Sequence, residues 1–308
     1  MPEICLVTCS RLPDLDDDDR LLIRPLAKLG WTVVPAVWDD PAVDWDRFDL
    51  TVIRSTWDYT DRRDAFVAWS RSVPRLLNPA HIIEWNTDKR YLSELAAAGV
   101  PVVDTKFVAA VDDLELPRDG EYVLKPSVGA GSLGADRYDA SRSDASERAA
   151  QHATRLIGAG YTVMIQPFVR SIEEAGETSV MLVNTEFSHG IRKGLMLGAH
   201  TRDEVEGLYR EEQIDPREPS SAELSLARQT INSLPFDPAE LLYARVDMVP
   251  GTDGSPLLME LELTEPSMFM VTTPGSPDRF AAAIASRAET SRAKKEAGRA
   301  PQRSMPGL

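Results

Sequence analysis

The sequence predicts an α/β protein that has a parallel sheet in its N-terminal third. Apolar runs at 3–9, 31–38 and 48–55 have the length and composition of buried strands. Stretches at 16–30 and 61–73 carry apolar residues at helical spacing and alternate with those strands. This alternation is typical of a parallel sheet with helices packed on its faces.

Later elements follow one another as strand pairs, which predicts an α+β arrangement towards the C-terminus. Asn86 or Thr87 is expected to cap a helix that ends at Gly99. A polar stretch at 200–219 is expected to be a mobile loop, and residues 289–308 a disordered tail, with a basic nucleic-acid arm as the alternative for the tail. The other expected elements are helices at 86–99, 144–158, 221–234 and 276–288, strands at 102–108, 121–126, 161–169, 243–249 and 257–264, and an antiparallel pair at 177–184 and 186–194.

Composition excludes several classes of function. Apolar residues make up 43% of the 308 residues, enough for a buried core. The formal charge of −15 disfavours nucleic acid and anionic membranes as partners. No apolar run reaches the ~20 residues of a membrane helix, and no basic segment precedes the first apolar run as in a signal peptide. Cys5 and Cys9 are too far apart in a strand to form a disulfide, so a reduced cytoplasmic protein is expected.

Acidic side chains recur at period two in the last two predicted strands. Arg245 and Asp247 point to one face of the first strand, and Glu260 and Glu262 to one face of the next. A short turn makes the strands neighbours, so three carboxylates converge with one guanidinium. Buried carboxylates need a cation, and oxygen ligands favour Mg²⁺ or Mn²⁺. The alternative is that these carboxylates face water on two amphipathic strands.

A strand, a lysine and a glycine-rich loop form the second motif, YVLKPSVGAGSLG. Gly129, Gly131 and Gly134 let the backbone approach a ligand closely, and Lys125 precedes them, a pattern that suits phosphate oxygens. The spacing matches neither a Walker A loop nor the dinucleotide fingerprint. Taken alone, the motif also fits an ordinary flexible loop.

The order of all these motifs resembles the ATP-grasp superfamily over about residues 1–288. It runs from Asp88-Lys89 through the LKP strand and its loop, MIQPFV, GETSV and HGIRKG to R-x-D and E-x-E. RSTWDY, NPAHIIEWNTDKRYL and ELELTEPSMF look closest to a small branch that includes a cycloserine-forming ligase acting on O-ureido-D-serine. The resemblance implies three lobes around a nucleotide cleft. Their ranges would be 1–85 (N-terminal domain), 86–170 (central lobe) and 171–288 (C-terminal lobe with the metal ligands), ahead of the tail at 289–308.

Particular roles follow from the resemblance. The residues implied to bind ATP are Lys89 and Lys125 at the phosphates, Ser132 over them, Gln166, Phe168 and Val169 at the adenine hinge, and Glu177 at the ribose. Lys193 and Arg245 would act in catalysis on the transferring phosphoryl group. Asp247, Glu260 and Glu262 would hold two Mg²⁺ ions, with Mn²⁺ as an option. Two departures are Glu262, where Asn is usual, and Pro167, where many members carry Glu.

Candidate substrate residues lie where predicted parallel strands end, the edge at which open α/β folds bind ligands. Arg54 could hold a carboxylate bidentately, with Ser55 and Asp58 beside it. One of Asp16 to Asp19, with Asp17 as the first candidate, could hold an amino group. The alternatives are a packed turn anchored by Trp57 and a solvated helix N-terminus.

The expected function is ATP-dependent ligation of a carboxylate to a nitrogen through an acyl phosphate, within one small amino-acid-like substrate or between two molecules. Positioning and charge neutralisation suffice for this chemistry, which fits the absence of a nucleophile signature. A small-molecule kinase and a non-catalytic nucleotide-binding module are the alternatives. A homodimer is possible.

Overall fold

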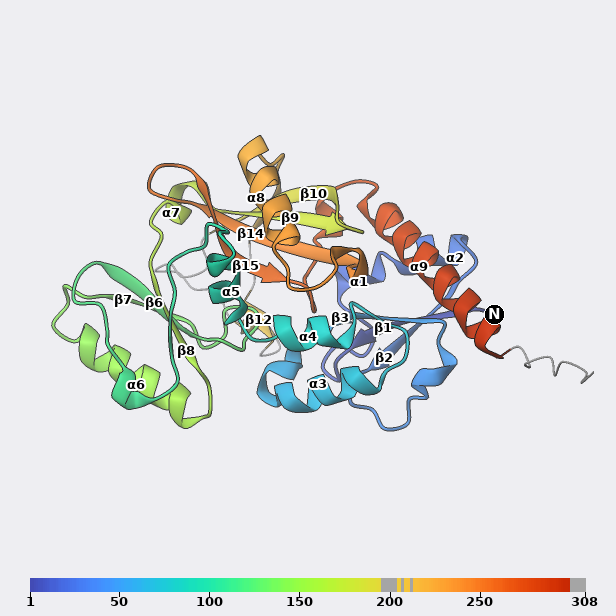
Figure 1. The fold of residues 1–308 in the computed structure, drawn as a ribbon, viewed down its shortest axis with the longest axis horizontal. Helices are drawn as coiled ribbons and strands as arrows, with labels where there is room; N and C mark the ends of the chain where they lie inside the picture. Colours follow the sequence, from blue (N-terminus) through green and yellow to red (C-terminus); the bar gives the residue numbers. More distant parts are fainter. Residues whose placement is uncertain (195–203, 206–207, 211–212, 300–308) are drawn as a thin grey trace, which may run out of the picture.

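The computed structural model describes residues 1–194, 204–205, 208–210 and 213–299, and most of its strands belong to three sheets (Figure 1). The N-terminal sheet and the central lobe lie at opposite ends of the molecule, and the largest sheet lies between them. In the part of the chain that the structure describes, no helix is long and apolar enough to cross a membrane.

The N-terminal sheet is parallel, as predicted, with strand order β2-β1-β3-β4. Successive residues of β1 face opposite sides: Ile4 and Leu6 pack with the core that includes α2 and α9, whereas Cys5 and Val7 pack on the side of α3. Cys5 and Cys9 are free and buried. The elements are β1 (Glu3–Thr8), α1 (Asp17–Arg20), α2 (Ile23–Lys28), β2 (Thr32–Val37), β3 (Leu50–Ser55), α3 (Arg63–Ser72) and β4 (Leu76–Leu77).

The central lobe is a four-stranded antiparallel sheet, β5-β8-β6-β7, with α6 on one face. Tyr122 and Leu124 of β6 pack with alanines of α6. Val123 and Lys125, which alternate with them, therefore face the other side, towards the largest sheet. The elements are β5 (Lys106–Val108), β6 (Glu121–Pro126), β7 (Asp136–Asp139), α6 (Ala145–Gly158) and β8 (Val163–Pro167).

The largest sheet is antiparallel, with order β13-β10-β9-β14-β15. Val180 and Val246 lie on the face that packs against Leu226 and Ile231 of α8. Arg245 and Asp247 alternate with Val246 and so belong to the opposite face. The elements are α7 (Ile172–Ala175), β9 (Glu177–Val183), β10 (Glu186–Lys193), β11 (Glu204–Val205), β12 (Tyr209–Arg210), β13 (Ile214–Pro216), α8 (Ser221–Asn232), β14 (Tyr243–Pro250) and β15 (Pro256–Glu262).

The predicted loop at 200–219 is wrong where the structure describes it. β11 and β12 form a two-stranded sheet, and β13 adds an edge strand to β10 in register with Lys193. The polar sequence suits an edge strand that has one face in water, a pattern easily read as a loop. Residues 195–203, 206–207 and 211–212 of the expected mobile loop lie outside the described residues.

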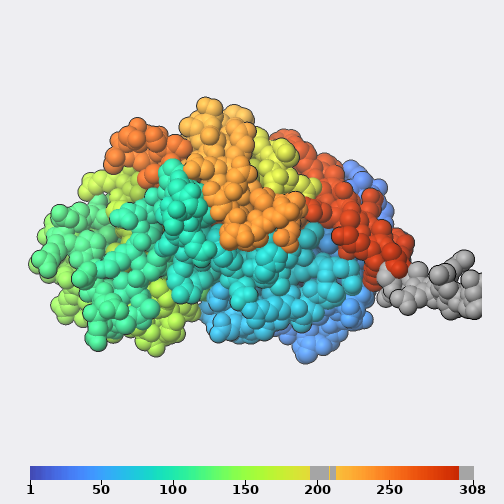
Figure 2. Space-filling view, in the orientation of Figure 1, coloured from blue at the N-terminus to red at the C-terminus, as the bar shows by residue number. Residues whose placement is uncertain are grey.

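The C-terminal helix α9 (Ser276–Arg299) is longer than predicted and joins two parts of the fold. Phe280 and Ile284 pack in one core with Ile4 and Leu6 of the N-terminal sheet and with Met181 of β9. Figure 2 shows this helix (red) lying against the N-terminal residues (blue). The expectation of disorder from residue 289 is therefore wrong up to Arg299. Lys295 explains part of this, because its Nζ donates to the carbonyl oxygens of Asp46 and Arg47.

The helix predicted at 86–99 is the shorter α5 (Tyr91–Ala97), and Asn86 belongs to a preceding helix that was not predicted, α4 (Ala80–Asn86). Asn86 ends the first helix and does not cap the second. Its side chain is buried, donating to the carbonyl of Leu261 at 2.8 Å and accepting from the N–H of Leu263 at 2.7 Å. Tyr91 similarly donates to the Leu261 carbonyl and accepts from its N–H. The chain turns between the helices because these side chains bond to the edge of β15.

Candidate active site

The three predicted metal ligands lie close together on β14 and β15. In the antiparallel register Arg245 is opposite Glu262 and Asp247 is opposite Glu260, and directly opposite residues have Cβ atoms about 5 Å apart. Asp247 is 1% exposed, and the Glu260 and Glu262 side chains are 23% and 22% exposed. The alternative of carboxylates facing open water is therefore wrong.

Each of these carboxylates has a basic partner. Arg245 lies between Asp247 and Glu262 and forms ion pairs with both. Lys193 pairs with Asp247 (Nζ to Oδ2, 2.9 Å) and with Glu177. Lys89 pairs with Glu260 at 3.1 Å. These ion pairs offset the negative charge of the carboxylates. A metal ion or a phosphate group that entered the site would have to replace some of them.

Burial and mutual repulsion set the protonation of the cluster. Burial, aided by Glu260 and Asp247, raises the pKa of Glu262 to about 8 in spite of Arg245. Burial opposes ionisation of Asp247 as well, but Arg245 and Lys193 outweigh it and hold the pKa of that carboxyl below its ordinary value. In the opposite sense, burial and two neighbouring lysines lower the pKa of Lys125. A cation bound beside Glu262 would favour the ionised form of this carboxyl and lower its pKa.

The donor set suits Mg²⁺, because it consists of carboxylate oxygens only. In the described ranges, no three acidic, histidine or cysteine side chains are already gathered as around a metal ion. The reason is geometric: each carboxylate is turned towards its basic partner. The fit therefore rests on the facing register of Asp247 and Glu260 and on the raised pKa of Glu262.

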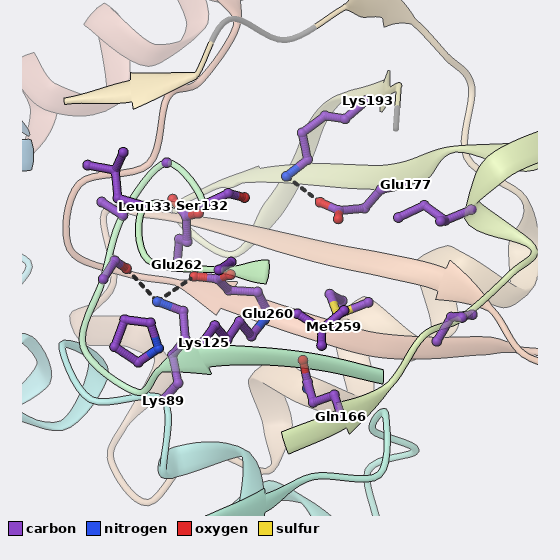
Figure 3. Close-up of a pocket in the computed structure, with 18 of the residues that line it drawn as sticks. Lys89, Lys125, Ser132, Leu133, Gln166, Glu177, Lys193, Met259, Glu260 and Glu262 are labelled. Carbon is purple, nitrogen blue, oxygen red and sulfur yellow. Dashed lines mark hydrogen bonds and ion pairs between the residues drawn. The ribbon is translucent and has the colours of Figure 1, made fainter. Parts of the chain in front are cut away.

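An open cleft of about 1100 Å³ separates the central sheet from the largest sheet (Figure 3). Lys125 and Glu260 both line it, although they come from β6 and β15. Figure 3 shows the labelled side chains pointing into this space, with Lys193 and Glu177 directed towards one another. The sequence-predicted residues that line the cleft are Lys89, Lys125, Ser132, Gln166, Phe168, Val169, Glu177, Lys193, Arg245, Glu260 and Glu262.

The glycine-rich loop forms one wall of this cleft. Lys89 Nζ donates to the carbonyl of Gly129 at 2.5 Å, which ties the loop to the carboxylate cluster. Gly134 has φ +72°, and a Cβ there would lie 3.3 Å from Pro126 Cδ. Glycine is therefore favoured at this position, because a side chain would strain the backbone and crowd Pro126. Ser132 also adopts a left-handed conformation (φ 58°), which is uncommon for a residue with a side chain.

One backbone group of the expected adenine hinge is already used within the sheet. The N–H of Phe168 donates to the carbonyl of Glu121 at 2.8 Å and so belongs to the sheet. The side chain of Gln166 donates to Thr105 Oγ1 at 2.8 Å. Phe168 lies under the guanidinium of Arg137, whose Cζ is 3.4 Å from the ring centroid.

A second cavity adjoins the first and shares its wall of Lys89, Arg245, Glu260 and Glu262. The opposite wall comes from the N-terminal domain and from the chain after β15. Its members are Asp16, Asp18, Trp57, Tyr59, Asn86, Glu265, Ser267 and Phe269.

The four candidate substrate residues do not line this cavity. Arg54 is 1% exposed, pairs with Asp19 at 2.8 Å and donates to the carbonyl of Pro266. Ser55 is fully buried and donates to the same Asp19. Asp58 accepts from the indole of Trp38 and pairs with Arg62, while Asp17 is 93% exposed beside Arg20.

Three of these interpretations are corrected because other side chains of the protein already pair with the polar group: Asp19 with Arg54 and Ser55, and Trp38 and Arg62 with Asp58. Asp17 is corrected for a different reason, because its side chain is 93% exposed and lies outside the cavity. The cavity instead receives Tyr59 and Glu265, which sequence reasoning missed, and Asp16 and Asp18 of the acidic run in which an amino-group ligand was expected. Glu265 follows Glu260 and Glu262 along the chain and could have been noticed as a third acidic residue there. It was missed because it lies three residues after Glu262 and so breaks the period-two pattern.

Comparisons with known proteins agree on one family. The profile of the D-cycloserine synthetase DcsG N-terminal domain matches residues 4–78. The cycloserine biosynthesis protein DcsG of Streptomyces lavendulae is 36% identical over 297 residues, which cover 92% of this chain and 98% of that protein. A crystal structure of D-cycloserine synthetase DcsG matches with TM-score 0.82 and 33% identity, covering 93% of this chain and 99% of the other. D-alanine–D-alanine ligase of Bacillus anthracis matches with TM-score 0.63 and 15% identity over 96% of this chain and all of the other, a likeness of fold alone.

Proposed function

Because this chain belongs to the family of D-cycloserine synthetase DcsG and is an ATP-dependent ligase that forms a C–N bond, we propose that it activates the carboxylate of a small amino-acid-like substrate as an acyl phosphate. A nitrogen of the same molecule then closes a ring, as cycloserine formation requires. The role would be in antibiotic biosynthesis.

One observation carries this proposal: the two cavities meet at Arg245, Glu260 and Glu262. A nucleotide in the first cavity would present its terminal phosphate at this shared wall. A carboxylate entering from the second cavity would meet it there, next to the one arginine of that wall. Two reactants held at one point gain the rate advantage of an intramolecular reaction.

ATP-grasp ligases generally use ATP with Mg²⁺. We propose two ions here, with Mn²⁺ as a substitute, held by Asp247, Glu260 and Glu262. Bound ions would neutralise the phosphate oxygens and polarise the phosphorus that is attacked. The extra charge of Glu262, where Asn is usual in the superfamily, would strengthen the hold on a divalent ion.

The chain's own residues do the remaining work. Lys89 and Lys125 bind phosphate oxygens, while Ser132 and its loop exclude water above them. Lys193 and Arg245, which pair with Asp247 in this structure, would stabilise the charge of the transferring phosphoryl group. Glu177 accepts from the ribose, and the chain from Gln166 to Val169, with Phe168, packs against the base.

The test measures product, ADP and phosphate together. Wild-type enzyme with MgATP is given O-ureido-D-serine and a panel of amino-acid derivatives. We expect substrate-dependent ADP, an equal amount of free phosphate and a cyclised product. A phosphorylated product without free phosphate would establish a kinase, and no ADP with any substrate would contradict the proposal.

A matched pair of variants assigns the site. Lys125→Met should lower turnover by at least 100-fold because a phosphate cation is lost. Lys106→Met removes a lysine of the same lobe whose side chain is 45% exposed, and should leave turnover unchanged. Equal activities of the two variants would contradict the cleft assignment.

Three further expectations belong to this proposal. The domain boundaries are taken at 85/86 and 170/171, with the metal ligands in the last lobe. The protein is expected in the cytoplasm, and a homodimer is the oligomer to test for. Light scattering of the purified chain tests the last point.

A further inference from the structure

The proposed ligation leaves one task unassigned, the removal of a proton from the attacking nitrogen. The second cavity must supply the group, because the nitrogen approaches the acyl carbon from that side. Its acidic members beyond the metal ligands are Asp16, Asp18 and Glu265.

The two aspartates are engaged in local structure. Asp16 caps α1, where its Oδ1 accepts from the N–H of Asp18 at 3.0 Å. Asp18 in turn accepts from the N–H of Val271 at 2.9 Å. Each carboxylate therefore holds a backbone segment in place.

The backbone around Glu265 is fixed from outside by three side chains. Tyr243 donates to the carbonyl of Thr264 at 2.8 Å, Trp57 to that of Glu265 at 3.0 Å, and Arg54 to that of Pro266 at 2.7 Å. Three consecutive carbonyls are thus held by residues of the N-terminal domain and β14. Such constraint places a side chain with the accuracy that catalysis needs.

The Glu265 side chain itself is kept available. The residue is 8% exposed, and the hydroxyl of Tyr59 lies near enough to act on its pKa. Within the described ranges no basic side chain forms an ion pair with it, in contrast to Asp247, Glu260 and Glu262. Burial raises the pKa of Glu265 to about 7 against the opposing effect of the Tyr59 hydroxyl. A carboxyl with that pKa is matched to accept a proton near neutral pH.

We propose that Glu265 is the general base of the ligation step and that Tyr59 orients it. This rests on the proposed function. The nitrogen lone pair forms the C–N bond, the bond between the acyl carbon and the phosphate oxygen breaks, and phosphate leaves with its electron pair. The proton of the nitrogen passes to the Glu265 carboxylate and later to solvent. No oxidant or further reactant is needed.

The experiment separates phosphorylation from ligation. Glu265→Gln keeps the shape of the side chain but accepts no proton, and general-base loss costs about 10²–10⁴-fold. We therefore expect the ratio of cyclised product to ADP to fall at least 100-fold while substrate-dependent ADP formation stays within about tenfold of wild type. Added hydroxylamine should trap the stranded acyl phosphate as a hydroxamate.

A control variant, Glu240→Gln, and a second substitution of Glu265 make each outcome of this experiment interpretable. Glu240→Gln changes an acid whose side chain is 41% exposed and should leave the ratio unchanged. Equal losses of ADP and product in a folded Glu265→Gln, or an unchanged ratio, would overturn the role. If that variant does not fold, Glu265→Asp withdraws the carboxylate by one methylene and must also lower the ratio; a wild-type ratio would overturn the proposal. Failure of the wild-type enzyme to form ADP with any substrate would instead refute the proposed function.

Discussion

Replacing Arg54 by methionine should unfold the protein more easily and should not act primarily on substrate binding. The Arg54 and Asp19 side chains are 1% and 4% exposed and their ion pair is 2.8 Å long. Methionine keeps most of the buried stem but leaves Asp19 without a cation. Breaking a buried pair from one side costs about 3–5 kcal/mol. The loss of the bond to the Pro266 carbonyl adds to this.

Urea unfolding followed by tryptophan fluorescence measures the effect as a lower midpoint at unchanged slope. Arg71→Met is the control, since the side chains of Arg71 and its partner Glu84 are 58% and 47% exposed and such a surface ion pair contributes about 0–1 kcal/mol. Asp19→Asn combined with Arg54→Met should be more stable than the sum of the single losses by about 2–3 kcal/mol, because no lone charge remains. A single Arg54→Met variant with the wild-type midpoint and a raised KM would refute this reasoning and restore Arg54 as a substrate ligand.

Three other predictions concern the cluster and its loop. Glu260→Gln should abolish ATP turnover and lower the melting temperature of the apo protein, since Lys89 loses its partner; retained turnover would contradict the metal assignment. The pKa of Glu262 is raised from 4.5 to about 8, so its contribution to stability is full below about pH 4.5 and is lost as pH rises through 8. The urea midpoint of the wild type should therefore fall over this pH range, and Glu262→Gln should reduce the fall. Midpoints of the two proteins that fall equally with pH would contradict this assignment. Residues 128–135 should be cleaved by protease in the apo protein and protected by Mg²⁺ with a non-hydrolysable ATP analogue, and cleavage unaffected by nucleotide would disprove a closing loop.

The spacing of apolar residues and the order of the elements along the chain correctly predicted the parts of the fold in which local pattern and tertiary contacts agree. The alternation of β1 to β3 with helices gave the parallel sheet, and period two placed Asp247, Glu260 and Glu262 on one face. Lys125 was placed correctly because its strand leads straight into the glycine loop. In each case a few consecutive residues contain the whole signal.

Where the structure differs from the prediction, the cause is a contact with a residue far away in the sequence. Asn86 carries a capping signal, yet its side chain is used by a strand 175 residues away. In the sequence Arg54 looks like a ligand-binding arginine, but in the structure its guanidinium pairs with Asp19 and donates to the carbonyl of Pro266. The helix past residue 288 depends on Lys295 reaching carbonyls near residue 47. No window of sequence contains both partners of these contacts.

The outer edge of β15 has a consequence for assembly. Backbone at 101–103 bonds to Leu258, and the side chains of Tyr91, Asn86 and Asn78 bond to the backbone of Leu261 and Leu263. Exposed strand edges are where foreign strands add and aggregation begins. Here the edge of the strand that carries Glu260 and Glu262, two of the proposed metal ligands, is bonded by these side chains and by this short backbone segment instead of by a full neighbouring strand. A homodimer of this chain would therefore have to form through another surface, and peptides that add to sheet edges should not inhibit the enzyme at this one.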